Sequence, residues 1–318
     1  MRTFHPGQTN AVVAAGMGTA VAVVLSMLGL YVPVFSTVIF LLIPLPIAYI
    51  GVTHGTRWSA IVTAGTLILD SVFFGVFSGA FVCAIFACLG TVLGWCYQRK
   101  VRPAATLFAG ALAVLIAFAL QILFGVFVLG VDTSLLDGSF LEGIRQSTEE
   151  LLPQFYSGET LAAAQESLNV TYDVLKKSVL FIGVTVCVIY SWAAMALSAY
   201  IFGRLGLRDI PALPPLSRWE LPTASVYAYL VVIGLGLLYT EEDWIATLIY
   251  NLQLVCSFIF WLQGLAFAWW LPARFEIFRT LRWFLIAGSF FLPFMQSVMV
   301  VMGLFDLLFH YRQKRNYQ

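Results

Sequence analysis

Charged residues are scarce in this sequence. Only 10% of its 318 residues are Asp, Glu, Lys or Arg, whereas about 25% is usual in soluble domains. Hydrophobic residues make up 61% of the chain and the mean hydropathy is +0.91, as in proteins that lie in a bilayer. The formal net charge is only +1. Because nucleic-acid binders concentrate basic residues on their surface, nucleic acid is not an expected partner.

Side chains that bind metals or carry redox chemistry are also few. The three histidines, His5, His54 and His310, are too far apart in the sequence to suggest a zinc site. The five cysteines lie within apolar runs, where cysteine behaves as a small hydrophobic residue: Cys83, Cys88, Cys96, Cys187 and Cys256. The HExxH, CxxC, Walker A, GxSxG and Rossmann glycine patterns do not occur. We therefore expect no metal site, no cofactor and no enzymatic activity.

Long hydrophobic runs are what the sequence has in abundance. A membrane-spanning helix needs about 20 mainly apolar residues, and such runs lie at 10–30, 34–53, 56–72, 73–97, 104–130, 178–203, 223–240 and 245–271. The last run, 283–309, is long enough for one tilted helix, but Pro293 near its middle also permits two short segments. The sequence therefore predicts an all-α, polytopic transmembrane helical bundle of about eight to ten spans in the lipid bilayer.

The positions of the basic residues predict the orientation of these spans. Lysine and arginine concentrate in short cytoplasmic loops, and 14 of the 17 basic residues fall at alternate span ends that are cytoplasmic if the N-terminus is inside. The segment 131–177 carries eight acidic and only three basic residues, so we place it outside. A cytoplasmic tail then requires 283–309 to cross twice or to dip in and return, which gives ten segments. Nine spans with an outside tail is the alternative.

The outside segment has a helical pattern of its own. After the helix-start signal Ser157-Gly158-Glu159, apolar residues recur at helical spacing: Leu161, Ala164, Leu168, Tyr172 and Leu175. We expect an amphipathic helix from about 159 that continues into the span beginning near 178, as one long helix that projects above the membrane.

Four prolines in the loop 204–222 exclude a continuous helix there, so this loop is the expected hinge between two blocks. The predicted organisation has five parts: an N-terminal transmembrane block at 1–130, an extracytoplasmic acidic helical segment at 131–177, a central span at 178–203, a proline-rich cytoplasmic linker at 204–222, and a C-terminal transmembrane block with a basic tail at 223–318.

Two acidic residues fall within spans, where ionisable groups are costly and are by default functional candidates. Asp70 lies late in the third span. It is either a ligand or cation contact at the mouth of an outward-facing cavity, or it is a solvated helix end or a cap at the tight turn into the next span. Asp306 lies four residues before His310 and six before Arg312, so His310 shares its helical face. A structural tether at the cytoplasmic rim is favoured over a proton relay, because only one histidine is near.

Four glutamines also lie deep in apolar runs, and each must find a hydrogen-bond partner in a medium without water. They either line a site or form interhelical hydrogen bonds, and the pattern favours neither. The ligand-binding candidates are Asp70, Gln121, Tyr172 and Gln263. The candidates for structural polar contacts are Gln253, Gln296, Asp306 and Arg312.

Small residues form ridges along the first span. Ala11 with Ala15, and Ala14 with Gly18 and Ala22, have the small-xxx-small spacing that lets helices approach closely. The neighbour is either another helix of this chain or a separate subunit. Ala11, Ala15, Gly18 and Ala22 are therefore the candidates for helix docking.

Four stretches, in order along the chain, carry a resemblance to a known family. They are the alanine-rich first span followed by Tyr31-Val32-Pro33 and Leu42-Ile43-Pro44-Leu45-Pro46, the loop Pro214-Pro215-Leu216-Ser217-Arg218-Trp219-Glu220-Leu221-Pro222, the stretch Leu262-Gln263-Gly264-Leu265-Ala266, and Gly303-Leu304-Phe305-Asp306 followed by Arg312. Over most of its length the chain resembles the YybS family of multi-pass bacterial membrane proteins.

That family looks related to the substrate-binding S-components of energy-coupling-factor transporters, which are small helical bundles that bind solute from outside. The resemblance implies a helical-bundle binder in a bacterial cytoplasmic membrane. It also implies that the small-residue face of the first span docks onto a coupling membrane protein that works with ATPase subunits.

The leading functional hypothesis is a non-enzymatic solute-binding or transport component for a small solute. The alternative is an envelope scaffold or regulatory protein, whose outer helix and proline-rich loop contact protein partners. A membrane-embedded enzyme is the weakest reading, because a catalytic site would need converging acid, base or metal groups that the sequence barely offers.

Overall fold

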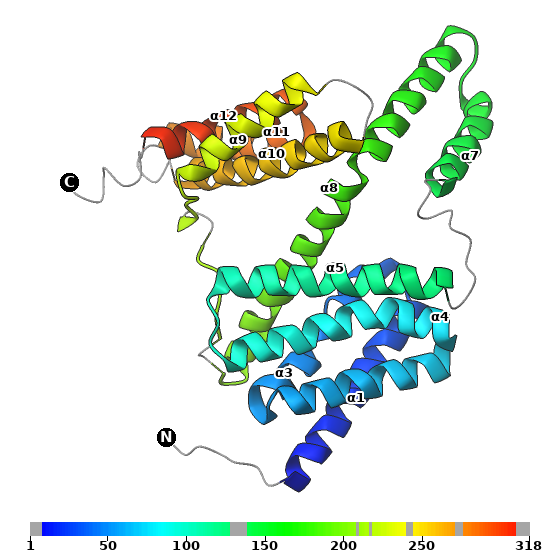
Figure 1. Cartoon of the computed structure of the whole chain (residues 1–318), viewed down its shortest axis with the longest axis vertical. Coiled ribbons are helices and arrows are strands. Elements are labelled where there is room, and N and C mark those ends of the chain that lie inside the picture. Colours follow the sequence, from blue (N-terminus) through cyan, green and yellow to red (C-terminus); the bar gives the residue numbers. More distant parts are fainter. Residues whose placement is uncertain are drawn as a thin grey trace. The chain divides into compact units, whose positions relative to one another are not determined.

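The computed structural model describes residues 8–127, 139–207, 210–215, 218–239, 244–270 and 276–309. Within these residues all regular structure is helical, with eleven α-helices and one short 3₁₀-helix (Figure 1). The chain divides into two units. Unit 1 comprises Met1–Asp137 and Gly183–Leu213, and unit 2 comprises Gly138–Ile182 and Pro214–Gln318. The prediction of an all-α protein is confirmed.

Unit 1 begins with α1 (Gln8–Tyr31), the 3₁₀-helix η1 (Pro33–Phe35), α2 (Ser36–Phe40) and α3 (Pro44–His54). Helix α1 ends just before Pro33, since the residue before a proline is driven out of helical conformation. Helix α3 starts on Pro44, where the missing backbone N–H removes no helical hydrogen bond.

Helix α4 (Thr56–Gln98) is broken at Gly75, whose φ of 82° is a left-handed conformation that glycine adopts without steric cost. The two halves fold back on each other, and as a result the hydroxyls of Thr63 and Thr91 lie 2.6 Å apart. Thr63 also donates to the carbonyl of Ala87 at 3.2 Å. Gly75 therefore makes the turn near the boundary expected between the 56–72 and 73–97 runs.

Glycines set the closest helix crossings of unit 1. A Cβ on Gly51 of α3 would lie 2.8 Å from the Cα of Gly94, and a Cβ on Gly90 would lie 2.7 Å from the carbonyl oxygen of Pro44. Helix α5 (Pro103–Phe127) meets α8 (Glu159–Arg204) at Ser191, whose hydroxyl donates to the carbonyl of Leu107 at 3.0 Å. Backbones at this spacing leave no room for a methyl group.

The small-residue ridge of α1 is covered by the chain's own helices. Ala11, Ala15 and Ala22 are buried, and a Cβ on Gly18 would lie 3.0 Å from Cγ1 of Ile50 in α3. Ala15 and Ala22 belong to an apolar cluster built from α1, α3 and α4. Of the two neighbours considered for this ridge, the structure provides the one within the same chain.

Helix α8 (Glu159–Arg204) runs unbroken for 46 residues and belongs to both units. The prediction of one long helix from about 159 through the central span is therefore confirmed. After α8, the described residues up to 223 contain no α-helix, in keeping with the four prolines of the 204–222 loop. The division between the units at Leu213 and Pro214 falls within this loop.

Unit 2 contains α7 (Ser139–Phe155), α9 (Ala224–Leu238), α10 (Trp244–Trp270), α11 (Glu276–Phe291) and α12 (Pro293–Phe309). Helices α10 and α12 cross at two glycines. A Cβ on Gly303 would lie 2.8 Å from the amide nitrogen of Gly264, and a Cβ on Gly264 would collide with the backbone of Met299. Helices α11 and α12 meet at an angle of 120°, with the break before Pro293.

The expected number of eight to ten spans is not supported. Among the described residues, six helices are long and apolar enough to cross a membrane, or seven if the bent α11–α12 pair counts as one span. The runs 73–97 and 223–240 instead contain the shorter apolar helices Ala84–Gln98 and Ala224–Leu238. Hydropathy alone does not reveal where a helix is interrupted, and α9, with 15 residues, falls short of the roughly 20 that a span needs.

Candidate functional site

A helical hairpin outside the apolar runs is the most distinctive polar structure in the chain. It consists of α7 and the first part of α8, residues 159–177, joined by a turn at Gly158 with φ of +62° (Figure 1). The Thr160 hydroxyl donates to the carbonyl of Ser157 at 2.7 Å, and the Leu161 amide donates to the carbonyl of Gly158 at 3.2 Å. These contacts close the turn and start α8.

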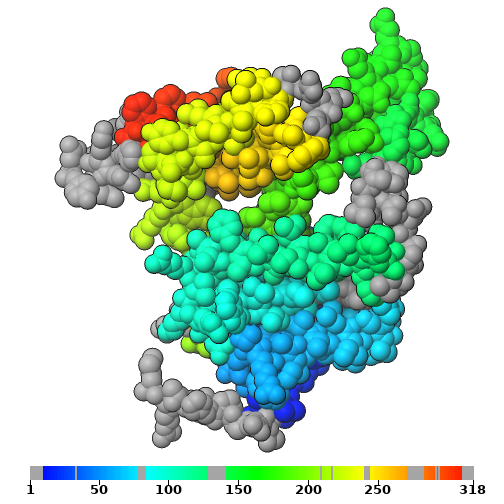
Figure 2. Space-filling view, in the orientation of Figure 1, coloured from blue at the N-terminus to red at the C-terminus, as the bar shows by residue number. Residues whose placement is uncertain are grey.

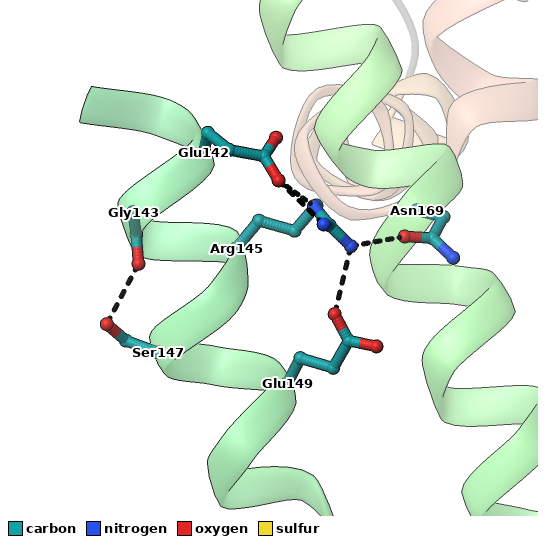
Figure 3. Close-up of polar contacts among 6 residues, drawn as sticks. All are labelled: Glu142, Gly143, Arg145, Ser147, Glu149 and Asn169. Atoms are coloured by element: carbon teal, nitrogen blue, oxygen red, sulfur yellow. Dashed lines mark hydrogen bonds and ion pairs between the residues drawn. The ribbon is translucent and has the colours of Figure 1, made fainter. Parts of the chain in front are cut away.

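Arg145 holds the two helices of the hairpin together (Figure 3). Its Nε and Nη2 donate to Glu142 at 2.9 and 2.6 Å, and its Nη1 donates to Glu149 at 2.9 Å. Glu142 and Glu149 lie one turn to either side on α7, whereas Nη1 also reaches Oδ1 of Asn169 on α8 at 3.2 Å. The guanidinium further lies 5.7 Å from the ring centroid of Tyr172 on α8. We call this cluster the Arg145 clamp.

The clamp changes the acidity of its carboxylate. The hydrogen bonds from the Arg145 guanidinium lower the pKa of Glu142 to about 2 from its ordinary value of 4.5. A planar guanidinium with several fixed donors can satisfy both carboxylates and the Asn169 amide at once, which a lysine ammonium does less well. The clamp is therefore a preformed network and not an isolated surface ion pair.

Beside the clamp, a groove of about 590 Å³ runs between the two helices. Its lining is mainly apolar or small. Leu152 of α7 and Tyr156, which directly follows α7, contribute to it together with Thr160, Ala163, Ala164, Ser167, Leu168 and Thr171 from α8. In the space-filling view the hairpin, drawn in green, presents both helices at the surface (Figure 2). The groove could accommodate an apolar side chain, or the apolar face of a helix, that packs against the surface of the hairpin.

A buried polar pair joins the helices of unit 2 within the apolar runs. Gln263 on α10 donates through Nε2 to Oδ2 of Asp306 on α12 at 2.7 Å, and both residues are almost fully buried. The pair lies next to the glycine crossing formed by Gly264 and Gly303. Asp306 is thereby placed in contact with a glutamine. His310 and Arg312, which the sequence pattern associates with Asp306, lie outside the described residues.

Asn251 makes a contact that the sequence analysis missed. Its Nδ2 donates to the carbonyl of Lys177 at 2.6 Å, and its Oδ1 accepts from the amide of Phe181 at 2.8 Å. These backbone groups are four residues apart and belong to one rung of α8. Asn251 thus holds α10 against α8 at the point where the hairpin ends and the apolar part of α8 begins. The sequence signal that could have pointed to Asn251 is the presence of a polar residue inside the apolar run of α10.

The remaining polar candidates differ in burial. In unit 1, Asp70 on α4 is fully buried and Gln121 on α5 is buried. In unit 2, Gln253 is half-buried, with its Oε1 3.3 Å from where a Cβ on Gly236 would lie, and Gln296 is exposed on α12.

The ligand-binding candidates of unit 2 belong to two different clusters. Gln263 is engaged with Asp306, whereas Tyr172 packs against the Arg145 clamp. Asp70 and Gln121 belong to unit 1. Among the described residues, no group of three or more His, Cys, Asp or Glu side chains could hold a metal ion. The polar structure thus consists of separate local contacts.

Comparison with known proteins adds a family. A family model described as "Predicted membrane protein (DUF2232)" matches residues 20–307. The uncharacterized protein YybS of Bacillus subtilis (strain 168) is 23% identical over 316 residues, covering 96% of this chain and 99% of YybS. No solved structure matches the chain. Because the family match extends over most of the sequence, the chain belongs to the DUF2232 family of predicted membrane proteins.

Proposed function

We propose that this multi-pass protein is a non-enzymatic scaffold or regulatory component of a bacterial cytoplasmic membrane, and that it contacts protein partners through the α7–α8 hairpin. The observation that carries this proposal is the Arg145 clamp, which joins two helices beyond the apolar part of α8. A rigid surface loses less conformational entropy on binding than a flexible one. The hairpin is built as such a surface.

The charge of the segment supports a location outside the cytoplasm. Residues 131–177 carry eight acidic and three basic residues, whereas lysine and arginine concentrate in cytoplasmic loops. Side chains at the hairpin also suit protein contact, since Leu151, Phe155 and Tyr156 are all exposed. Aromatic residues on a rigid element are typical of the centres of protein interfaces.

Site-specific photocrosslinking in living cells tests this proposal. A photoreactive residue at Phe155, which is 77% exposed, should give discrete protein adducts, and the same residue at the similarly exposed Leu237 of α9 should give none of these. Replacing Arg145 by Ala should remove the Phe155 adducts, because the hairpin helices then separate. Adducts that are absent, or that are unaffected by loss of the clamp, would reject the proposal.

Solute binding by unit 1 is the second candidate, and the buried carboxyl of Asp70 favours it. An ionisable side chain with no exposed surface inside an apolar helix is a functional candidate by default. The relation to S-components that we infer from the sequence would point the same way. Docking of a coupling protein on the α1 ridge is not part of this proposal, because α3 and α4 already cover that ridge.

Mass spectrometry of small molecules retained by the purified protein tests the second candidate. A solute held by Asp70 should be found with the wild type and should be lost from Asp70→Asn, while Gln296→Leu on the exposed side of α12 should retain it. Purification together with an ATPase pair would add support. A wild-type protein that retains no solute from cell membranes would reject this candidate.

A further inference from the structure

We propose that the hairpin groove binds a cationic amphipathic α-helix of a protein partner, which packs as a third helix against α7 and α8. This inference rests on the proposed function, since it names the kind of partner that the hairpin contacts. It depends on three features of the same face: the groove itself, a row of small residues along its floor and a row of acids along its edge.

The floor of the groove has the spacing of a helix-packing seam. Thr160, Ala164, Ser167 and Thr171 follow one another at intervals of four, three and four residues, and all four line the groove. This is the heptad spacing that keeps one face of a helix against a partner helix. Small side chains at these positions allow the partner backbone to come close, while Leu152 of α7 and Tyr156 just after it supply apolar contacts at the side.

The edge of the groove is acidic. Glu159, Glu166 and Asp173 follow at intervals of seven residues and are all exposed. Glu159 lies four residues before Ala163, which lines the groove, and Glu166 lies three residues after it. Residues three and four apart are neighbours on a helix surface, so both carboxylates lie beside the groove-lining Ala163. Charges at such positions select a partner of opposite sign.

This charge pattern chooses between occupants. A second copy of the chain would bring two acidic rows together, and like charges across a helix interface oppose pairing. An anionic lipid surface would be repelled for the same reason. A helix with lysine or arginine beside its apolar stripe can pack on the small residues of the groove and pair with the acidic residues at its edge. We therefore take such a helix as the occupant.

Binding of synthetic peptides to the full-length protein in nanodiscs tests this inference. The probe is an amphipathic helical peptide with leucines at heptad spacing flanked by lysines, and its matched control carries glutamates in place of the lysines. The lysine peptide should bind, and the glutamate peptide should bind at least about tenfold more weakly. Affinity for the lysine peptide should fall as salt is raised. Equal binding of the two peptides would overturn the inference.

Adjacent alanines provide matched protein variants. Ala163 lines the groove, whereas Ala162 is exposed on α8 but does not line it. Ala163→Trp should weaken binding of the lysine peptide about tenfold or more, and Ala162→Trp should leave it within about twofold. Since both substitutions place the same ring on an exposed helical position, unequal folding does not explain a difference. Equal effects of the two variants would contradict the groove as the binding site.

The photocrosslinking experiment separates failure of this inference from failure of the proposed function. If the Phe155 adducts persist in Ala163→Trp and the peptides do not discriminate, then the hairpin contacts partners elsewhere and the groove inference is wrong. If no adducts form at Phe155 in the wild type, the proposed function itself is wrong. Adducts lost from Ala163→Trp and retained in Ala162→Trp would support both.

Discussion

The two units hold their helices together by different means. Unit 1 brings backbones into contact at glycines such as Gly51, Gly90 and Gly94, and its interhelical polar contacts come from hydroxyl groups such as those of Thr63 and Ser191. One amide also takes part in unit 1, where Gln98 Oε1 accepts from the Thr56 hydroxyl at 2.8 Å. Unit 2 also has a glycine crossing, and its contacts between helices include carboxyl and guanidinium groups as well as amides. Among the described residues, charged side chains thus join helices in unit 2, whereas the contacts named for unit 1 use glycines, hydroxyls and one amide.

The contrast matters because polar contacts fix register as well as contributing energy. Asn251 binds one particular rung of α8, and Gln263 meets Asp306 beside Gly303. Each contact specifies which turn of one helix faces which turn of another. In unit 2 the Asn251 contact holds α8 at the base of the hairpin, whereas Gln263 and Asp306 join α10 to α12. The predictions below test that division, from the largest expected effect to the smallest.

Gly264→Ala should destabilise the protein most, by about 3 kcal/mol, because a Cβ there collides with the Met299 backbone, which cannot move aside cheaply. Gly234→Ala in α9, where a Cβ meets nothing within 4 Å, should change stability by less than about 0.5 kcal/mol. Unfolding in mixed micelles measures both. Similar effects for the two variants would show that the close helix crossing at Gly264 does not stabilise unit 2.

Asn251→Leu should cost about 1–2 kcal/mol, since it removes the amide that binds two backbone groups of α8. The cost is limited because the Lys177 carbonyl and the Phe181 amide can still pair with each other as a helical rung. Leu252→Ala, at the exposed neighbouring position, is the control. Amide hydrogen exchange at residues 177–181 measures the effect on α8. Unchanged exchange in Asn251→Leu would show that unit 2 does not depend on the contact between Asn251 and α8.

Asp306→Leu should destabilise the α10–α12 pair by about 1 kcal/mol, because it leaves the buried Gln263 amide without its partner. Asp306→Asn should recover most of this loss, since an amide oxygen can accept the same hydrogen bond. The same unfolding assay compares the two. If Asp306→Asn is as damaging as Asp306→Leu, the carboxyl has a role beyond holding Gln263.

Acid should open the hairpin with the smallest change. The folded-state pKa of Glu142 is lowered to about 2, below its ordinary 4.5. A group with a lowered pKa contributes stability above its ordinary value and loses it as the pH falls through the folded value. The distance between spin labels on the exposed Gln146 and Val170 should therefore stay constant at neutral pH and widen between about pH 4.5 and 2.

Glu142→Gln is the control for the acid experiment, because an amide cannot titrate. In this variant the distance between the two spin labels should widen less between about pH 4.5 and 2 than it does in the wild type. Opening at the same pH in wild type and Glu142→Gln would mean that another group governs the hairpin.

Sequence patterns predicted the features that depend on local periodicity. The all-α class, the long helix through 178 and the break in helix at the proline-rich loop all follow from spacing within one segment. The span count failed where continuity depends on a single residue, as at Gly75, or on the length of helix that forms, as in α9.

Pairings between segments could not be predicted. Gln263 and Asp306 were each candidates, but nothing within either helix indicates that these two residues, 43 positions apart in the sequence, lie together. Asn251 was missed because its partners are backbone groups, which every residue has and no sequence pattern marks. The Arg145 clamp combines a local i, i+4 pattern, which the sequence displays, with Asn169, which only the folding of the hairpin provides.

Accessibility of the hairpin in intact cells tests the central claim most directly. A cysteine at Glu150, an exposed position on α7, is introduced into a chain whose five native cysteines are replaced by alanine. A membrane-impermeant thiol reagent should label it in intact cells as fully as in opened membranes, if the clamp-held hairpin faces a partner outside. Labelling that requires opened membranes would place the hairpin in the cytosol and contradict the account.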